Sequence, residues 1–282
     1  MTLSNQKDRD SQAPAVSLSV QGSSVTAKIT DNAKNALSQD RITLTVDGQS
    51  VPFSFNASSG TLTATLSGLG KDLHRVTVTA ADCCGNLGRG SATLEGTSPN
   101  PFADMNGHWA AGMTGRLNQL GIISGVTVGS QTYFYPNRSI TRGDFALMTA
   151  RWLGLDLDDY QNVQLPYADQ SQIPSWDVNA VKALYQLGIM QGSQGSDGSL
   201  RANARSSITR AEAMTILSRT QAKGYAQASL SAFSDAGQVP AWSETHVASL
   251  VGQQVVSGSN GQLRPQAPVS RAEVAKLLFT LW

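Results

Sequence analysis

Thr141-Arg142-Gly143-Asp144 recurs with small changes as Thr209-Arg210-Ala211-Glu212 and as Ser270-Arg271-Ala272-Glu273. In each copy a hydroxyl residue stands three positions before an acid, just ahead of an apolar run, which is the capping box that begins a helix. The arginine is unexpected there, because a cation in the first turn opposes the helix macrodipole by about 0.3–1 kcal/mol. The repetition indicates a role, and a guanidinium beside free helix N–H groups predicts a site for a carboxylate or phosphate.

The arginine stretches belong to a longer repeat that occurs three times. Each copy opens with an aromatic residue, a small residue and an aspartate, and the openings lie 65 and 66 residues apart. A tryptophan follows the aspartate, and a glycine follows the first predicted helix. These candidate positions are Asp104, Asp169 and Asp235; Trp109, Trp176 and Trp242; and Gly125, Gly192 and Gly258. A period of this length predicts a triplicated helix-loop-helix unit.

These ordered motifs resemble the S-layer homology (SLH) family, whose modules hold bacterial surface proteins on the cell wall. The resemblance covers about residues 102 to 282. It implies an all-α, pseudo-threefold bundle, a three-pronged spindle with binding grooves between neighbouring repeats. It also implies a partner, a secondary cell wall polysaccharide whose amino sugars commonly carry pyruvate ketals. A pyruvate ketal presents a carboxylate, so the resemblance agrees with the anion site that the arginines predict.

The resemblance and the composition together define an expected function and location. We expect non-covalent anchoring of an extracellular protein to the bacterial wall or S-layer, with no cofactor and no metal. The formal net charge of +1 offers no basic field for nucleic acid. The sequence contains no apolar run of about 18 residues, so it predicts no membrane span. The start, Met1 to Asp10, lacks the apolar core of a signal peptide, so we expect a segment of a larger secreted precursor with a further domain upstream.

Residues 14–97 have a different pattern, in which apolar and polar residues alternate as in half-buried strands. Asp47-Gly48 separates two such segments, 42–46 and 51–55, and is a strong two-residue hairpin signal. We expect a seven-stranded antiparallel sandwich, with the last strand near 90–95, that resembles a bacterial Ig-like domain. Its expected role is a spacer, with adhesion as the alternative. The neighbouring Cys83 and Cys84 are expected in a turn as thiols rather than as a strained disulfide.

The chain therefore divides into six predicted segments, which make the fold class multidomain, all-β followed by all-α. They are a disordered or linker segment (1–13), the Ig-like sandwich (14–97), a linker (98–101), and SLH repeats 1 (102–165), 2 (166–230) and 3 (231–282). Because one two-helix repeat has too little apolar surface to fold alone, the repeats should share a core. We expect this core to contain Phe145, Leu147, Met148, Met214, Leu217, Val274, Leu277 and Leu278.

Each recurring residue type also has a structural interpretation. The hydroxyl and acid residues of the three boxes are expected to be helix caps. For Arg142, Arg210 and Arg271, ligand contact is favoured over a salt bridge to a neighbouring repeat. The tryptophans could pack at helix starts or stack on sugar rings. The aspartates could tie down loops or bind sugar hydroxyls. The glycines are expected to end helices and to let a sugar approach closely.

Departures between the repeats bear on which grooves are intact. Repeat 1 has Gly143-Asp144 where the family usually has Ala-Glu, and a long apolar loop over 126–133. Repeat 2 has Ala202 where proline is expected, with Ser206-Ser207 as an apparent insertion before its box. Repeat 3 has Gln254 where glycine is expected. We expect at least one intact groove, and two as the better estimate.

Catalysis on a wall glycan is the competing hypothesis from another class. It would need two carboxylates as acid and nucleophile, but the recurring acids are interpreted as caps and loop residues. His74, His108 and His246 are scattered, and no nucleophile or zinc motif is present. Asp156, Asp158 and Asp159 lack the spacing of a calcium loop. A purely structural or adhesive module that mediates protein assembly is the second alternative.

Overall fold

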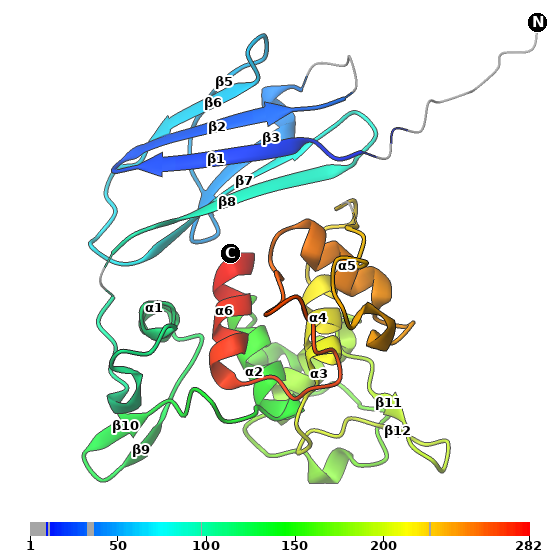
Figure 1. Ribbon diagram of the computed structural model, residues 1–282. Helices are drawn as coiled ribbons and strands as arrows, with labels where there is room; N and C mark the ends of the chain where they lie inside the picture. The colour runs from blue at the N-terminus through cyan, green and yellow to red at the C-terminus, as the bar shows by residue number, and fades with distance from the viewer. Residues whose placement is uncertain (1–9, 11, 33–36, 97, 226) are drawn as a thin grey trace, which may run out of the picture.

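The computed structural model describes residues 10, 12–32, 37–96, 98–225 and 227–282. Figure 1 shows two lobes, strands β1 to β8 above and the helices below, with the end of α6 facing the strands. The expected disordered or linker segment, 1–13, falls largely outside the described residues. The bounds of the first eight strands are β1 (Ala15–Gln21), β2 (Ser24–Thr30), β3 (Ile42–Val46), β4 (Gln49–Ser50), β5 (Ser54–Asn56), β6 (Thr61–Thr65), β7 (His74–Ala81) and β8 (Leu87–Leu94).

The strands form two antiparallel sheets, in the orders β1-β2-β6-β5 and β4-β3-β7-β8. The buried alternate residues of both sheets, Val25, Ala27 and Ile29 on one and Leu44 and Val78 on the other, belong to one core. Because every second residue of these strands points into the core, the two sheets pack face to face, as the alternation in the sequence predicts.

The Asp47-Gly48 turn is confirmed as a two-residue hairpin. Val46 pairs with Gln49, and both turn residues have positive φ, 49° and 78°, as a type I′ turn requires. The predicted strand over 51–55 is wrong, because the chain leaves the first sheet after Val51 and pairing resumes at Ser54 in the other sheet. The Sγ atoms of Cys83 and Cys84 lie 3.8 Å apart, so no disulfide joins them.

Six α-helices follow in the part of the chain that the structure describes, two in each repeat. Short 3₁₀ turns at Ala103–Met105, Gln170–Gln172 and Ala236–Gln238 open the repeats, and a small hairpin separates the helices in repeats 1 and 2. The predicted apolar loop over 126–133 is one of these hairpins. The bounds are α1 (Ala111–Gln119), β9 (Val126–Val128), β10 (Gln131–Tyr133), α2 (Arg142–Trp152), α3 (Val178–Gln186), β11 (Ser193–Gln194), β12 (Leu200–Arg201), α4 (Arg210–Arg219), α5 (Glu244–Gly252) and α6 (Arg271–Leu281).

The second helix of each repeat begins at the predicted cap. Thr141, Thr209 and Ser270 each accept a hydrogen bond from the backbone N–H three residues on. In α4 and α6 the glutamate also accepts from the N-cap N–H, which completes the capping box. Asp144 does not complete the box. Its shorter side chain accepts instead from the Thr141 hydroxyl, at 2.9 Å.

The three repeats meet in a closed ring of backbone hydrogen bonds just before these caps. The Ile140 N–H donates to Val269, the Val269 N–H to Ile208, and the Ile208 N–H to Ile140. All three side chains are buried in a single apolar cluster that spans the three repeats. The shared core is therefore confirmed, except that Leu147 and Leu277 are only partly buried.

The ring also corrects the predicted alignment of repeat 2. Tyr135, Asn203 and Arg264 share a positive φ of 50–55°. The backbone N–H of each donates to the opening aspartate of its repeat. Asn203 is thus equivalent to Tyr135, and Ala204, not Ala202, takes the place of Pro136. Ser206-Ser207 is no insertion, because Pro136, Ala204 and Pro265 each stand six residues before the arginine of their repeat.

The glycines expected to end the first helices do not do so. The C-cap residues of those helices are Leu120, Leu187 and Gln253, and the next residue in each repeat has positive φ. Gln254 holds the position that glycine occupies in the other repeats, at φ 60°. Gly125, Gly192 and Gly258 lie four residues further on. A Cβ at any of them would collide with the opening aromatic of its repeat, Phe102, Tyr167 or Phe233.

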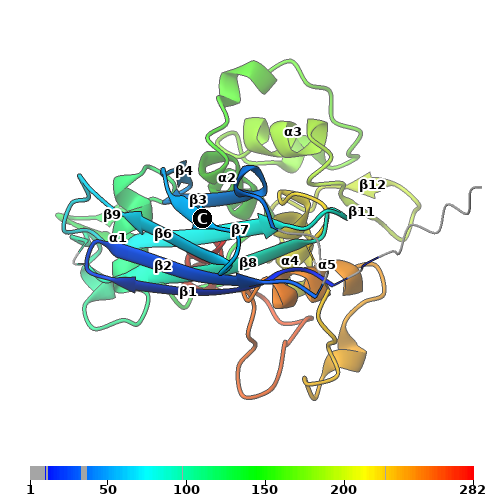
Figure 2. The same cartoon turned by 90° about the horizontal axis from the view of Figure 1, so that it is seen from above.

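The sandwich rests on all three repeats. In repeat 1, Arg116 binds Asp47 at 2.8 Å; in repeat 2, Gly224 accepts from the Leu87 N–H. In repeat 3, Arg89 donates to the Thr280 and Trp282 carbonyls at the end of α6. Figure 2 shows the resulting stack from above, with the sheets over the helices and α3 and α5 projecting on opposite sides.

Candidate ligand-binding grooves

Two of the three recurring arginines form ion pairs with the next repeat. Arg142 Nη1 lies 2.8 Å from Glu212, and Arg210 Nη1 lies 2.8 Å from Glu273. The Nε of each arginine donates to a backbone carbonyl of the same neighbour, Ala202 or Leu263. Each glutamate uses its other oxygen to cap its own helix, so it joins the helix start to the preceding repeat. The salt bridge that the sequence left as the less favoured alternative is therefore present at two of three junctions.

Arg271 has a different environment. Its Nε donates to the Phe134 carbonyl at 2.7 Å and its Nη2 to the Ser124 carbonyl at 2.8 Å. The guanidinium also lies over the Phe134 ring, 4.6 Å from its centroid. Among the described residues no carboxylate forms an ion pair with it, because Asp144 stands where the other junctions have glutamate. Burial lowers the pKa of Arg271, yet an arginine stays charged at neutral pH.

The helix N–H groups expected to help bind an anion are already occupied. The Arg142, Arg210 and Arg271 N–H groups donate to Ser206, Ala267 and Arg138. The next N–H of each helix donates to Ala204, Pro265 or Pro136, and the third is held by the cap hydroxyl. Any anion site here therefore depends on side-chain cations, not on the helix start.

Three grooves lie beside the three arginines, and each is built by all three repeats. One repeat supplies the arginine, the next supplies the glycine and the capping acid, and the third supplies the tryptophan. Their volumes are about 290, 320 and 360 Å³. We name them by their arginines: the Arg142 groove with Gly192 and Trp242, the Arg210 groove with Gly258 and Trp109, and the Arg271 groove with Gly125 and Trp176.

The tryptophans are exposed and the aspartates are not. Trp109, Trp176 and Trp242 are 56%, 64% and 56% exposed, which favours ring stacking on a ligand over packing in the core. Asp104, Asp169 and Asp235 each accept two successive backbone N–H bonds of 2.7–2.8 Å and line none of the grooves. Although burial opposes it, these bonds hold the pKa of Asp235 below its usual range. The aspartates thus fix the loop that carries the carbonyl bound by each arginine.

Sequence reasoning missed several groove residues. Arg138 and Arg151 line the Arg271 groove, Lys276 and Arg264 the Arg210 groove, and Arg219 the Arg142 groove. Arg151, Arg219 and Lys276 follow their capping boxes at helical spacing, on the face that carries the capping acid. That spacing could have identified these three residues from the sequence. No such pattern marks Arg138, because its position depends on the loop before the cap.

Asp177 is a buried acid that sequence reasoning did not single out. It is fully buried at the start of α3, and neither of its carboxylate oxygens has a hydrogen-bond partner among the described residues. Burial, then the charge of Asp144, raises its pKa to about 7. Its Oδ2 occupies the space that a Cβ on Gly143 would need. This contact explains why repeat 1 has glycine where the other boxes have alanine.

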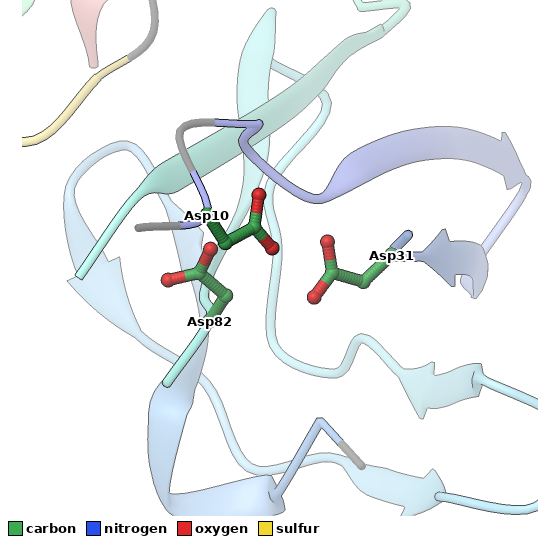
Figure 3. Close-up of side chains that lie close together, drawn as sticks. All are labelled: Asp10, Asp31 and Asp82. Carbon is green, nitrogen blue, oxygen red and sulfur yellow. The ribbon is translucent and has the colours of Figure 1, made fainter. Parts of the chain in front are cut away.

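The remaining candidate residues line none of the three grooves. His74 contacts Asp47 within the sandwich, and His246 contacts Ser218. His108 accepts a hydrogen bond from the Ala110 N–H of its own loop. Asp156 caps the short 3₁₀ turn Leu157–Tyr160. Of the residues that the structure describes, only Asp10, Asp31 and Asp82 gather closely enough to share an ion (Figure 3). Asp82 is already bound by the Cys84 and Asn86 N–H groups, as in an Asx turn.

The S-layer homology domain is the family whose sequence profile matches this chain, at residues 101–146, 166–214 and 232–275. The matched ranges coincide with the three structural repeats, including the arginine and the capping acid of each. The chain therefore carries three S-layer homology domains and belongs to a cell-surface, wall-associated protein. No helix in the described part of the chain has the length and apolarity to cross a membrane.

Similar proteins include surface-layer proteins and glycosidases. The chain is 29% identical over 187 residues to an amylopullulanase of Thermoanaerobacterium thermosulfurigenes, covering 64% of this chain and 9% of that protein. It is 27% identical over 186 residues to exoglucanase XynX of Acetivibrio thermocellus, covering 64% and 16%. It is 28% identical over 174 residues to S-layer protein EA1 of Bacillus anthracis, covering 61% and 19%. The chain thus matches only a small part of each relative.

Proposed function

We propose that this chain anchors a surface protein non-covalently by binding an anionic, pyruvylated secondary cell wall polysaccharide in the grooves between its repeats. The observation that carries the proposal is the construction of the grooves. Each combines a guanidinium, an exposed indole face and a close-packed glycine from three different repeats. Arginine suits a carboxylate, and an exposed aromatic face suits a sugar ring.

The proposal assigns the recurring acids a structural role and no catalytic one. Glu212 and Glu273 bind both a helix cap and an arginine, and the three opening aspartates bind backbone N–H groups. A glycosidase needs an acid and a second carboxylate directed at the scissile bond. We therefore propose that any activity of the whole protein lies outside this chain, in a domain upstream.

The sandwich fits a spacer role in this proposal. Residues 14–97 form two packed antiparallel sheets around one core, and we infer an Ig-like domain from this arrangement and from the alternating sequence. Its contacts with all three repeats hold it beside the anchor. Adhesion would require a binding surface on the outer sheet, which the contacts described above leave uncovered.

A sedimentation and calorimetry experiment tests the proposed function. Purified wall polysaccharide bearing pyruvate ketals is compared with the same material after mild acid has removed the ketals. We expect saturable binding to the first and at least about tenfold weaker binding to the second, because a desolvated arginine–carboxylate pair is lost. Equal binding to both would reject the anionic ligand. Release of reducing sugar would reject the non-catalytic assignment.

A further inference from the structure

The three grooves are equivalent in backbone and unequal in charge. In the Arg142 groove the guanidinium is paired with Glu212, and Arg219 donates to the Ile189 carbonyl. In the Arg210 groove, Glu273 binds both Arg210 and Arg264, at 2.8 and 3.1 Å. A carboxylate entering either groove would therefore compete with a carboxylate that the protein already supplies.

The Arg271 groove lacks this internal competitor. Asp144 turns toward the hydroxyl of its own cap, and Arg271 uses two nitrogens on backbone carbonyls. Those carbonyls fix the guanidinium plane, and no carboxylate of the described residues forms an ion pair with it. Arg138 and Arg151 also line this groove, and neither forms an ion pair with any residue that the structure describes.

One methylene accounts for the difference between the junctions. Glutamate at this position spans from the N-cap N–H, 2.9 Å away, to the arginine of the preceding repeat, 2.8 Å away. Aspartate is too short to do both, and at position 144 it does neither. The neighbouring backbone is the same at all three junctions, so the length of the acid decides whether the arginine is engaged.

We propose that the Arg271 groove takes the carboxylate of the acidic wall glycan, and that Asp144 determines this specificity by leaving Arg271 without a carboxylate partner. The inference rests on the proposed function and deepens it. Trp176 supplies the sugar platform, and Gly125 lines the same groove. Arg138 and Arg151 supply further positive charge around the carboxylate. Asp144 is a specificity-determining residue here, since it acts through Arg271.

The test is calorimetry of the full chain with two small probes. These are the methyl glycoside of an N-acetylated amino sugar with a pyruvate ketal, and the same glycoside without it. We expect one tight site for the acidic probe in the original chain. Asp144→Glu should weaken that site by about tenfold or more, because the added methylene lets the acid pair with Arg271. Asp144→Asn, which removes the charge without making a pair, should bind at least as tightly as the original.

The matched control is Glu273→Asp, which shortens the equivalent acid at another junction. It should release Arg210 and raise the stoichiometry for the acidic probe toward two. Thermal melting of every variant separates misfolding from a change in the groove. Unchanged affinity in Asp144→Glu, with normal melting, would overturn the inference and leave the proposed function standing. If the original chain binds neither probe nor the whole polysaccharide, the proposed function fails and the inference fails with it.

Discussion

The junctions at Arg142 and Arg210 and the junction at Arg271 have the same backbone and different chemistry. At the first two, arginine and glutamate complete a link between repeats, whereas at the third the arginine faces a groove without a carboxylate partner. The ring needs the backbone bonds at all three junctions, but it does not need all three ion pairs. A residue that recurs in a repeat can therefore have a structural role in some copies and remain available for a ligand in another.

We call a junction with an arginine–glutamate pair closed and the Arg271 junction, which has none, open. Removing one repeat should have the largest effect, because it eliminates one closed junction and the open one together. A chain that ends after Ser231 loses Val269 from the backbone ring and a third of the shared core. We expect the helical part to lose cooperative melting, as followed by circular dichroism at 222 nm. A sharp transition at an unchanged midpoint would mean that the two remaining repeats fold independently of the ring.

Alanine substitutions at the arginines should separate the two kinds of junction. Arg142 is 6% exposed and paired, so Arg142→Ala leaves Glu212 and a carbonyl without their partner and should cost about 3 kcal/mol of unfolding free energy. Arg271→Ala should cost about 1 kcal/mol, because it loses carbonyl bonds and no ion pair. Urea denaturation measures both. Equal costs would contradict the distinction between closed and open junctions.

The buried acid Asp177, next to Gly143 and Asp144, should make stability depend on pH. The groups facing Asp177 are Asp144 and Arg151 on α2 and Arg205 in the loop before α4. Its folded-state pKa, raised to about 7, lies above the unfolded value, so the folded protein holds more protons between about pH 4 and 7. Unfolding free energy should fall by about 2 kcal/mol from pH 5 to pH 8.

Asp177→Asn is the variant that checks this assignment. It removes the titrating group and keeps nearly the same volume beside Gly143. Its unfolding free energy should vary less between pH 5 and pH 8 than that of the original chain. Ser243, the equivalent residue in repeat 3, is uncharged, so Ser243→Ala should leave the pH dependence intact. An identical slope in Asp177→Asn and the original chain would assign the titration elsewhere.

Removal of an exposed tryptophan should have the smallest effect on stability. Trp176→Ala should change the melting temperature by no more than about 1 °C, since 64% of the residue is already exposed. Affinity for the acidic probe should nevertheless fall by about 1–2 kcal/mol through lost stacking. Trp109→Ala and Trp242→Ala serve as the matched comparison in the closed grooves. A larger loss from either of these would place the acidic ligand in another groove.

Sequence reasoning was most successful where local chemistry decides the structure. The three cap hydroxyls, the Asp47-Gly48 hairpin and the alternating strands all depend on residues within a few positions of one another. The shared core followed from the repeat itself. The predicted strand at Val51–Phe55 failed because the chain changes sheets at that point, which alternation alone does not reveal.

The candidate grooves were predictable in part. The arginines, tryptophans and glycines could be found from their recurrence, and all nine line a groove. The partners could not be found in this way, because they come from other repeats: Glu212 lies 70 positions from the arginine it binds. The same limitation applies to the helix N–H groups, which are occupied by carbonyls of the neighbouring repeat. The misplaced alignment at Ala202 arose because the spacing from the groove glycine to the positive-φ residue differs between repeats, at 10, 11 and 6 positions.

The seating of the sandwich on all three repeats has a mechanical consequence. The covalent link enters repeat 1 alone, so a pull on the sandwich would otherwise peel that repeat from its neighbours. Arg116, Gly224 and the end of α6 give the same pull three parallel routes, one into each repeat. Tension is thus divided across the ring and reaches the Arg271 groove along the axis of α6. We therefore expect the repeats to resist shear as one body for as long as the sandwich keeps its three contacts.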